Sequence, residues 1–399
     1  MDLRSGISIW QGIGERPAEY PPLDGDRSCE VAIVGGGITG ALLAYYLTRE
    51  GVDTILLDKG SPGTGSTIAS TGLLQYEADT PLCELIDKVG ESGAVRSYQL
   101  GLSAIDELER IVAEIQDDCG FARRSSLYLA GSRWHVRRLK REYESRAAHG
   151  FDVAYLTPDD LSQIASFQAA GAIRSEGNAQ IDPFRFTQRL LQHVVKLGLR
   201  CFRDSAVSQF VPDSAGISLK TEHGNVKARR AAVATGYAAH KQLRQDVGSL
   251  QYTYAAASAP LNSFEGWPDR CLIWEIARPY VYLRSTPDGR AVIGGGDTAF
   301  STDHKRDGLV KKKVDQLTRR FEEMFPQIKF EPEFAWAGTF SQTKDGLAYI
   351  GESPELPHAY FALGYGGNGI TFGAIAAKII TDLYLGRPNT DAAIFRFDR

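Results

Sequence analysis

Short apolar runs alternate with helical patterns in the first part of the chain after residue 28. An apolar run over residues 31–34 precedes a glycine-rich turn, and a helical pattern covers residues 41–47. A second apolar run, residues 54–57, ends on Asp58. This order of strand, turn, helix and strand predicts a parallel βαβ unit. Residues 1–28 are rich in proline, glycine and charge, and we expect them to form an extended arm.

The turn of this unit reads GGGITG. Gly35 permits the sharp turn, Gly37 lets a pyrophosphate approach the backbone, and Gly40 lets the helix pack closely on the strand. The N-terminus of the helix attracts phosphate. Asp58 lies where a carboxylate accepts hydrogen bonds from a ribose. The pattern predicts dinucleotide binding; the alternative is a glycine-rich turn that binds nothing.

The middle of the chain predicts an inserted domain. Helical patterns cover most of 81–150, and a loop with one short helix follows over 151–177. A helix is predicted over 184–197. The strands expected next would continue the βαβ unit, and they cover residues 200–203, 206–212, 216–222, 226–229 and 231–234.

Alternation of apolar and polar residues resumes over 250–300 and predicts antiparallel strands, in part over residues 271–276, 280–284 and 291–294. We interpret the glycine triplet 294–296 as the end of a strand. An amphipathic helix is predicted over 308–325.

The C-terminal part repeats the arrangement of strand, glycine-rich turn and helix. Strands are predicted over 334–339 and 359–363, with a short apolar run over 347–351 between them. The turn GYGGNG then leads into a helix over 370–385. This helix offers a second positive N-terminus to an electron-rich group. Two such ends suit a ligand that has both a pyrophosphate and a polar ring.

Composition excludes several classes of function. The net charge of −4 gives no basic footprint for nucleic acid, and the five cysteines show no spacing typical of a metal site or a disulfide framework. We therefore expect buried thiols, no metal, and a cytoplasmic location. We expect no signal segment, because the first residues of the sequence lack an apolar core of signal-peptide length, and no transmembrane helix, because no apolar run is long enough. We interpret the basic run over 133–146 as a solvated helix face; its central cations are Arg137, Arg138, Lys140 and Arg141.

These motifs together resemble the FAD-dependent oxidoreductases of the D-amino-acid oxidase superfamily, over nearly the whole chain. The group includes glycine oxidase, sarcosine oxidase, D-amino-acid dehydrogenase and gamma-glutamylputrescine oxidoreductase. The resemblance rests on VAIVGGGITG, LLDKG, the hydroxyl-rich loop over 60–77, ATGY, WAGTFSQTKDGLAYIG and GYGGNGITFGAIAAKII. The N-terminal arm looks most like the gamma-glutamylputrescine branch.

The resemblance implies an α/β fold, with a Rossmann-type FAD-binding domain and an inserted α+β substrate domain built on an antiparallel sheet. The FAD-binding domain would comprise residues 1–82, 178–249 and 334–399, and the substrate domain residues 83–177 and 250–333.

The resemblance also implies a set of cofactor residues. The glycine turn and its helix would hold the pyrophosphate, Asp58 the ribose, and the backbone of Val207 the adenine. The start of the last helix would face the pyrimidine end of the flavin. The expected cofactor-binding residues are Gly35, Gly37, Ile38, Thr39, Gly40, Asp58, Lys59, Ser66, Thr67, Ser70, Thr71, Gly72, Val207, Gly236, Gly338, Gly366, Gly367, Asn368, Gly369, Ile370 and Thr371.

The chain departs from its relatives at three places. The loop GSTIASTG has no His, and WAGTFSQTKDG has no Cys, so neither residue that relatives attach to flavin is present. We therefore expect noncovalent FAD. Relatives that oxidise amino acids read WAG-x-R, and Phe340 stands where that Arg grips the α-carboxylate. The strand AVIGGGD has no Lys, so the sequence does not choose between oxidase and dehydrogenase.

We expect an FAD-dependent enzyme that oxidises the C–N bond of an amine or amino-acid-like substrate by hydride transfer to flavin N5. Its pocket would be formed by Trp274, Tyr280, Tyr282, Phe340 and Tyr365, for which aromatic core packing is the alternative. Arg278 would bind a distant carboxylate or a surface acid. The alternatives for the whole chain are a D-amino-acid dehydrogenase or glycine oxidase-like enzyme, a non-catalytic flavin-binding subunit, and an NAD(P)-dependent dehydrogenase. The electron acceptor and the oligomeric state stay open.

Overall fold

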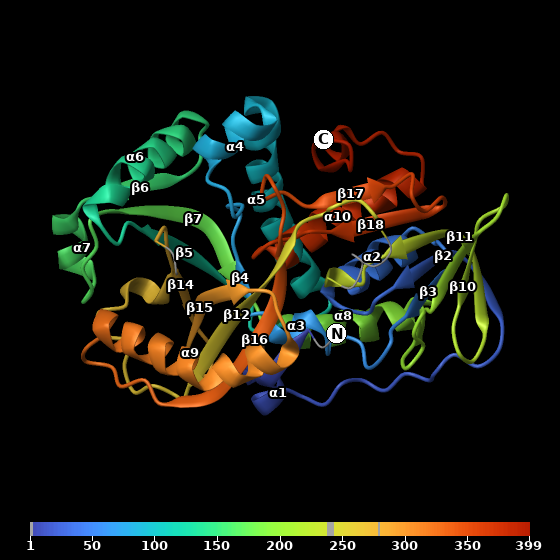
Figure 1. Cartoon of the computed structure of the whole chain (residues 1–399), viewed down its shortest axis with the longest axis horizontal. Coiled ribbons are helices and arrows are strands. Elements are labelled where there is room, and N and C mark those ends of the chain that lie inside the picture. Colours follow the sequence, from blue (N-terminus) through green and yellow to red (C-terminus); the bar gives the residue numbers. More distant parts are fainter. Residues whose placement is uncertain (1–2, 238–242, 278–279) are drawn as a thin grey trace.

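The computed structural model describes residues 3–237, 243–277 and 280–399. Within these ranges the chain forms two sheets that lie side by side, each covered by helices (Figure 1). One sheet has eight strands and the other ten.

The eight-stranded sheet contains the predicted βαβ unit. Its main path runs in the order β17-β18-β11-β2-β3-β8, and all neighbours on it are parallel except β17 and β18. A hairpin of β9 and β10 attaches to β11. The strands are β2 (Arg27–Val34), β3 (Thr54–Leu57), β8 (Arg200–Phe202), β9 (Gln209–Pro212), β10 (Ile217–Lys220), β11 (Asn225–Val233), β17 (Tyr349–Glu352) and β18 (Ala359–Leu363).

The ten-stranded sheet has the order β1-β16-β12-β15-β14-β13-β5-β7-β4, with β6 beside β7. Its described pairs are antiparallel, except that β13 runs parallel to β5. The strands are β1 (Arg4–Ile7), β4 (Leu73–Leu74), β5 (Ala122–Leu129), β6 (Val153–Leu156), β7 (Ala172–Gln180), β12 (Ser249–Ser258), β13 (Leu272–Glu275), β14 (Val281–Ser285), β15 (Ala291–Ala299) and β16 (Pro332–Gln342).

The helices cover both sheets. Helix α2 packs against α8 and α10, α2 and α10 also contact strands of the parallel sheet, and α9 packs on β12, β15 and β16 (Figure 1). The helices are α1 (Ile9–Ile13), α2 (Ile38–Arg49), α3 (Ser66–Ala69), α4 (Leu82–Val89), α5 (Glu91–Glu114), α6 (Arg133–Ala148), α7 (Pro158–Ile164), α8 (Pro183–Lys196), α9 (Asp303–Met324) and α10 (Gly369–Tyr384), with short 3₁₀ helices over Pro268–Arg270 and Thr390–Phe395.

The predicted fold class is confirmed. The apolar run 31–34 is buried as the end of β2, as expected for a parallel strand covered on both faces. Strands β3 and β18 have the predicted bounds. Helices α2, α8 and α10 begin within three residues of the predicted starts.

The prediction for residues 81–177 is wrong in part, because strands β5, β6 and β7 interrupt the expected helices and loop. Strand β7 reads AIRSEGNAQ, which has no apolar alternation. Two of its buried polar side chains have partners: Asn178 donates to Ser126 Oγ at 3.0 Å, and Ser175 Oγ accepts from Arg146 at 3.3 Å. Buried polar residues that are hydrogen-bonded hide a strand from hydrophobic pattern analysis.

The N-terminal arm is also more structured than predicted. Strand β1 pairs with β16 in the ten-stranded sheet, and α1 buries Trp10. The glycine triplet 294–296 does not end a strand, because β15 continues through an irregularity in its pairing with β12 as far as Ala299.

Sheet membership differs from the expected division into segments. The expected FAD-binding domain includes residues 1–28 and 334–342. Strands β1 and β16, which lie largely in these segments, belong to the ten-stranded sheet. The short strand β4, also in the first cofactor segment, pairs with β7 in that sheet. In the described part of the chain, no helix has the length and apolar character needed to cross a bilayer.

A buried ion cluster ties the helices of the inserted part to the loop after β4. The Arg146 guanidinium is fully buried; it donates from Nε to Glu142 and from Nη1 to Glu77 Oε1 at 2.9 Å. Glu142 also accepts from the backbone N–H groups of Leu82 and Cys83 at 3.0 and 2.9 Å, at the start of α4. One cation thus balances two carboxylates that have no access to water.

We predict that Arg146→Leu lowers the free energy of unfolding by about 3–5 kcal/mol, because it leaves buried carboxylates without their cation. Arg141→Leu is the matched control: Arg141 lies on the same helix, and its ion pair with Asp87 is exposed. Urea denaturation of both variants checks this. A similar small effect for the two variants would contradict the role given to the buried cluster.

Candidate active site

A cavity of about 740 Å³ runs between the two sheets. At one end it is lined by Asp58, Val207 and Phe210 from the parallel sheet and its loops. At the other end it is lined by Trp274, Tyr282 and other residues of the ten-stranded sheet. The N-termini of two helices also line this cavity. Helix α2 contributes Ile38 and Thr39, and α10 contributes Gly369 and Ile370.

The N-terminus of α2 lies against β2 because Gly40 has no side chain. A Cβ atom on Gly40 would lie 1.9 Å from the carbonyl oxygen of Gly35. The helix begins after Gly37 without a side-chain cap, although Ile38 N donates to Thr67 Oγ1 at 3.0 Å. Backbone N–H groups at this end therefore point towards the cavity, in the arrangement that binds phosphate.

Asp58 links the glycine turn after β2 to the loop after β3. Its carboxylate accepts from Gly36 N at 2.7 Å and from Gly60 N at 2.8 Å. Burial raises the pKa of Asp58, whereas the N–H groups of Gly60 and Gly36 lower it. A carboxylate oxygen accepts more than one hydrogen bond, so Asp58 keeps acceptor capacity for a ribose at the cavity wall.

The loop around α3 is fixed by side chains from the N-terminal arm and the ten-stranded sheet. Trp10 Nε1 donates to Ser70 O at 2.6 Å, and Trp336 Nε1 donates to Ala69 O at 2.8 Å. Arg284 Nη1 donates to the carbonyl oxygens of Thr71 and Gly72 at 3.2 and 2.8 Å. These contacts hold the hydroxyl-rich loop against the cavity.

The N-terminus of α10 is held by residues 75–79. Asn368 Nδ2 donates to Glu77 O, Gly367 N donates to Asp79 Oδ2 at 2.9 Å, and Thr371 Oγ1 donates to Gln75 O at 3.2 Å. Asn368 precedes the helix and gives it no side-chain cap. These contacts position the second helix N-terminus at the cavity.

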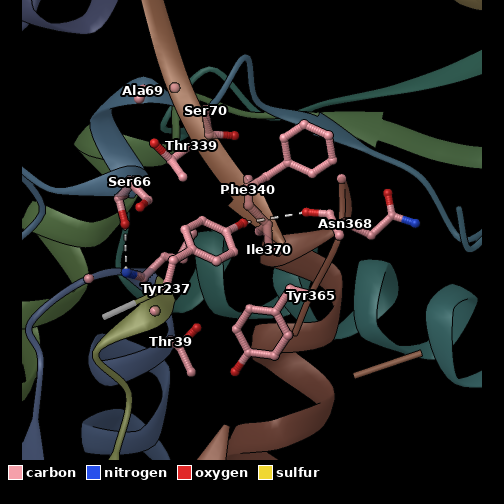
Figure 2. Close-up of a pocket in the computed structure, with 18 of the residues that line it drawn as sticks. Thr39, Ser66, Ala69, Ser70, Tyr237, Thr339, Phe340, Tyr365, Asn368 and Ile370 are labelled. Carbon is pink, nitrogen blue, oxygen red and sulfur yellow. Dashed lines mark hydrogen bonds between the residues drawn. The ribbon is translucent and has the colours of Figure 1, made fainter. Parts of the chain in front are cut away.

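Aromatic rings surround the cavity beside α10. Figure 2 shows Tyr237, Phe340 and Tyr365 around the space next to the start of that helix, with Thr39 and Ser66 beyond them. Tyr237 Oη lies 3.5 Å from Gly366 O. Tyr282 Oη lies 3.3 Å from Thr253 Oγ1. The five aromatic residues predicted for the pocket all line the cavity.

The structure brings most of the predicted cofactor residues to the cavity wall, but not Gly40, Gly72 or Thr371. Gly40 acts in helix packing, a Cβ on Gly72 would lie 2.2 Å from Ile181 O, and the side chain of Thr371 turns to Gln75. The predicted residues on the wall are Gly35, Gly37, Ile38, Thr39, Asp58, Lys59, Ser66, Thr67, Ser70, Thr71, Val207, Gly236, Gly338, Gly366, Gly367, Asn368, Gly369 and Ile370.

Sequence reasoning missed Tyr237, Thr253, Asp79 and Gln342, which also line the cavity. Tyr237 belongs to the ATGY motif, so its position directly after a predicted strand was an available signal. The other three come together only through the pairing of distant strands and the loop before α4.

Arg284, on β14 of the ten-stranded sheet, is absent from the described cavity wall. Arg284 is fully buried, and its Nη1 donates to three backbone carbonyls, including Ile181 O at 2.7 Å. Burial lowers its pKa to about 9. Its donors thus hold the backbone of the loop after α3 and the end of β7. Arg278 lies outside the described residues.

The family profile described as "FAD dependent oxidoreductase" matches residues 30–383. The chain belongs to this family. FAD is therefore its cofactor. Among relatives, the FAD-dependent oxidoreductase is 26% identical to the glycine oxidase of Bacillus subtilis, over 94% of this chain and 98% of the relative. It is 24% identical to the gamma-glutamylputrescine oxidoreductase of Escherichia coli, over 95% and 89% of the two chains.

A solved structure shares the fold of this FAD-dependent oxidoreductase. The crystal structure of glycine oxidase from Geobacillus kaustophilus superposes with a TM-score of 0.77, over 94% of this chain and 99% of that one, at 21% identity.

The residues present fit FAD. Both helix N-termini at the cavity lack side-chain caps, as needed for a pyrophosphate at α2 and a polar ring at α10. Several lining residues have buried hydroxyls without a hydrogen-bond partner in the described part of the chain; these are Ser66, Thr235 and Thr339. Such hydroxyls are ready to bond a polar ligand.

We predict that acid precipitation of the FAD-loaded protein releases all of its flavin, because the expected attachment points, His and Cys, are absent from the two loops. Absorbance of the supernatant and of the redissolved pellet near 450 nm checks this. Flavin that stays on the denatured chain would mean that another residue forms a covalent bond.

We predict that Gly37→Val reduces FAD occupancy at least tenfold but has little effect on the folding of the apoprotein. A Cβ on Gly37 meets only Thr67 Oγ1, at 3.1 Å, within 4 Å, so the larger side chain would project into the space for the pyrophosphate. The flavin-to-protein ratio and thermal unfolding of the apoprotein are measured together. Full occupancy in the variant would show that the pyrophosphate binds elsewhere.

Proposed function

We propose that this protein oxidises the C–N bond of an amine or amino-acid-like small molecule whose carboxylate is absent or lies far from the oxidised carbon. The observation that carries the proposal is Phe340, on β16 beside the N-terminus of α10. Its phenyl ring occupies the position at which the resemblance places a carboxylate-binding arginine.

Bound FAD supplies the hydride acceptor for this reaction. The residues of this chain would bind the amine, orient it and exclude water. Figure 2 shows Tyr237, Phe340 and Tyr365 around the start of α10. Their rings give apolar area to an alkyl chain and keep the amine in a dry environment, in which its neutral form is favoured.

We infer that the tyrosine hydroxyls of the pocket bind the substrate by hydrogen bonds and do not transfer protons. Burial raises the pKa of Tyr282, and burial together with Asp79 raises the pKa of Tyr237. Both hydroxyls therefore stay protonated at neutral pH and act as hydrogen-bond partners. We assign no general base, since removal of a hydride from a neutral amine requires none.

Phe340 also argues against a simple α-amino acid. A buried carboxylate that loses its hydrogen-bonded cation costs several kcal/mol. Phenylalanine offers neither charge nor donor. A glycine oxidase-like or D-amino-acid dehydrogenase-like activity is the second candidate, favoured by the identity to glycine oxidases over nearly the full length. It would require a cation from elsewhere in the chain.

An anaerobic screen of amines and amino acids tests the proposal. We expect amines without a nearby carboxylate to bleach the flavin absorbance. A complete absence of bleaching by any amine would favour a non-catalytic flavin-binding subunit. The electron acceptor and oligomeric state stay open, and the cytoplasmic location stays a prediction.

We predict that Phe340→Arg raises the rate of flavin reduction by glycine or D-alanine about tenfold or more and lowers the rate with the natural amine. The guanidinium would supply the missing bidentate partner and remove apolar contact area. Phe340→Leu is the control, since it alters size without adding charge. Rapid reduction by glycine in the unmodified protein would contradict the role given to Phe340.

A further inference from the structure

One cation of the basic run over 133–146 lines the cavity. Arg138, on α6, is a wall residue at the end formed by the ten-stranded sheet. Its neighbours on the helix are engaged elsewhere: Arg141 pairs with Asp87 at 2.8 Å, and Lys140 lies 5.5 Å from the ring centroid of Tyr155. The interpretation of this run as a solvated helix face is therefore incomplete.

Arg138 is joined to the aromatic pocket by a row of side chains across the sheet. Tyr282 on β14 lies opposite Trp274 on β13, and Trp274 lies opposite Tyr128 on β5. The rings of Tyr128 and Trp274 stack with their centroids 3.8 Å apart. Leu139 of α6 packs in the same cluster as Tyr128, and the preceding residue, Arg138, lies on the cavity wall with Tyr128. Burial raises the pKa of the Tyr128 phenol, and the Arg138 guanidinium lowers it against this effect, as expected for a cation at the end of the row.

The extent of this row gives the length of ligand that would cross it. Neighbouring strands lie about 4.8 Å apart, so the two steps from Tyr282 to Tyr128 span about 10 Å. An extended chain covers about 3.5 Å per three bonds, and about eight or nine bonds would cross this distance. Gly294 on β15 makes room for the row, because a Cβ there would lie 2.4 Å from the ring of Tyr282.

The partner of Arg138 is exchangeable. Its Nε and Nη2 donate to the two carboxylate oxygens of Glu84 at 2.5 and 3.0 Å, but both side chains are more than a third exposed. Ion pairs of this exposure contribute little to stability. Glu275, an acid on the same wall, is paired with Arg320 instead. A ligand carboxylate can therefore replace Glu84 on Arg138.

We propose that Arg138 determines specificity by binding the remote carboxylate of the substrate, so that the substrate is an amine with a carboxylate about eight or nine bonds from its nitrogen. This assignment rests on the proposed amine oxidation and names the end of the substrate that does not react. It accounts for Phe340, because the carboxylate is bound at Arg138 and not beside the flavin.

The test measures binding by calorimetry on the FAD-loaded protein, which needs no turnover. The ligands are 4-aminobutanoate, 6-aminohexanoate, 8-aminooctanoate and, as the uncharged-tail control, n-octylamine. We expect 8-aminooctanoate to bind about tenfold more tightly than n-octylamine and than 4-aminobutanoate. Equal or weaker binding of 8-aminooctanoate would overturn the proposal.

Three variants assign the effect to Arg138. Arg138→Gln should abolish the tenfold preference without changing the affinity for n-octylamine. Arg141→Gln, which removes the same charge from the same helix, should retain it. Glu84→Gln removes the competing carboxylate and should strengthen binding of 8-aminooctanoate a few-fold, a gain that damage to the fold would not produce.

Equal losses in Arg138→Gln and Arg141→Gln would show a general field effect and overturn the assignment, as would unchanged binding in Arg138→Gln. The two proposals fail separately. Flavin bleaching by amines with no preference for a carboxylate tail removes only the role of Arg138. Selective binding of 8-aminooctanoate without any flavin reduction would contradict the amine oxidation.

Discussion

The close contact between Gly40 and the carbonyl of Gly35 fixes the cofactor end of the molecule. Any larger residue at position 40 would push α2 away from β2. With the helix in place, its N–H groups face the cavity, and Asp58 holds the turn by accepting from Gly36 and Gly60. The second helix N-terminus, at Gly369, lies at the same cavity. Because the two helix N-termini lie at separate places on one cavity, they suit a ligand with charge or polarity at two separate points.

Buried arginines connect the rest of the chain to this frame. Arg284 reaches from β14 to the backbone of Thr71 and Gly72, and Arg146 reaches from α6 to Glu77 in the segment that holds α10. Both guanidiniums are fully buried. Because a buried charge without its partners is costly, these contacts specify how the inserted parts sit against the cofactor cavity.

The parts of the fold with strong local signals were predictable. Residues 31–57 carry a turn, a helix and two apolar runs, and residues 359–385 repeat that pattern, so both glycine turns and most of their wall residues were predicted. Strand β7 was not, because its buried Ser175 accepts a hydrogen bond from distant Arg146 and its buried Asn178 donates one to distant Ser126. Strand β1 was not predicted either, since it pairs with β16, which lies more than 300 residues later in the sequence.

The pocket shows the same division. Phe340 stands out within a recognisable motif, whereas Thr253 and Arg138 reach the cavity only when separate elements pack together. In sequence the basic helix α6 has the pattern of a solvent-exposed face, and only the folded cavity wall shows that Arg138 lies at the aromatic row. Long-range strand pairing, and not composition, decides these positions.

A crystal structure of the FAD-loaded protein tests the central claim most directly. The account predicts the pyrophosphate at the N-terminus of α2, a ribose hydroxyl on Asp58, and the pyrimidine edge of the flavin at Gly369 and Ile370, with no bond between flavin and protein. Flavin bound in the reverse orientation, or with its polar ring away from α10, would contradict the account.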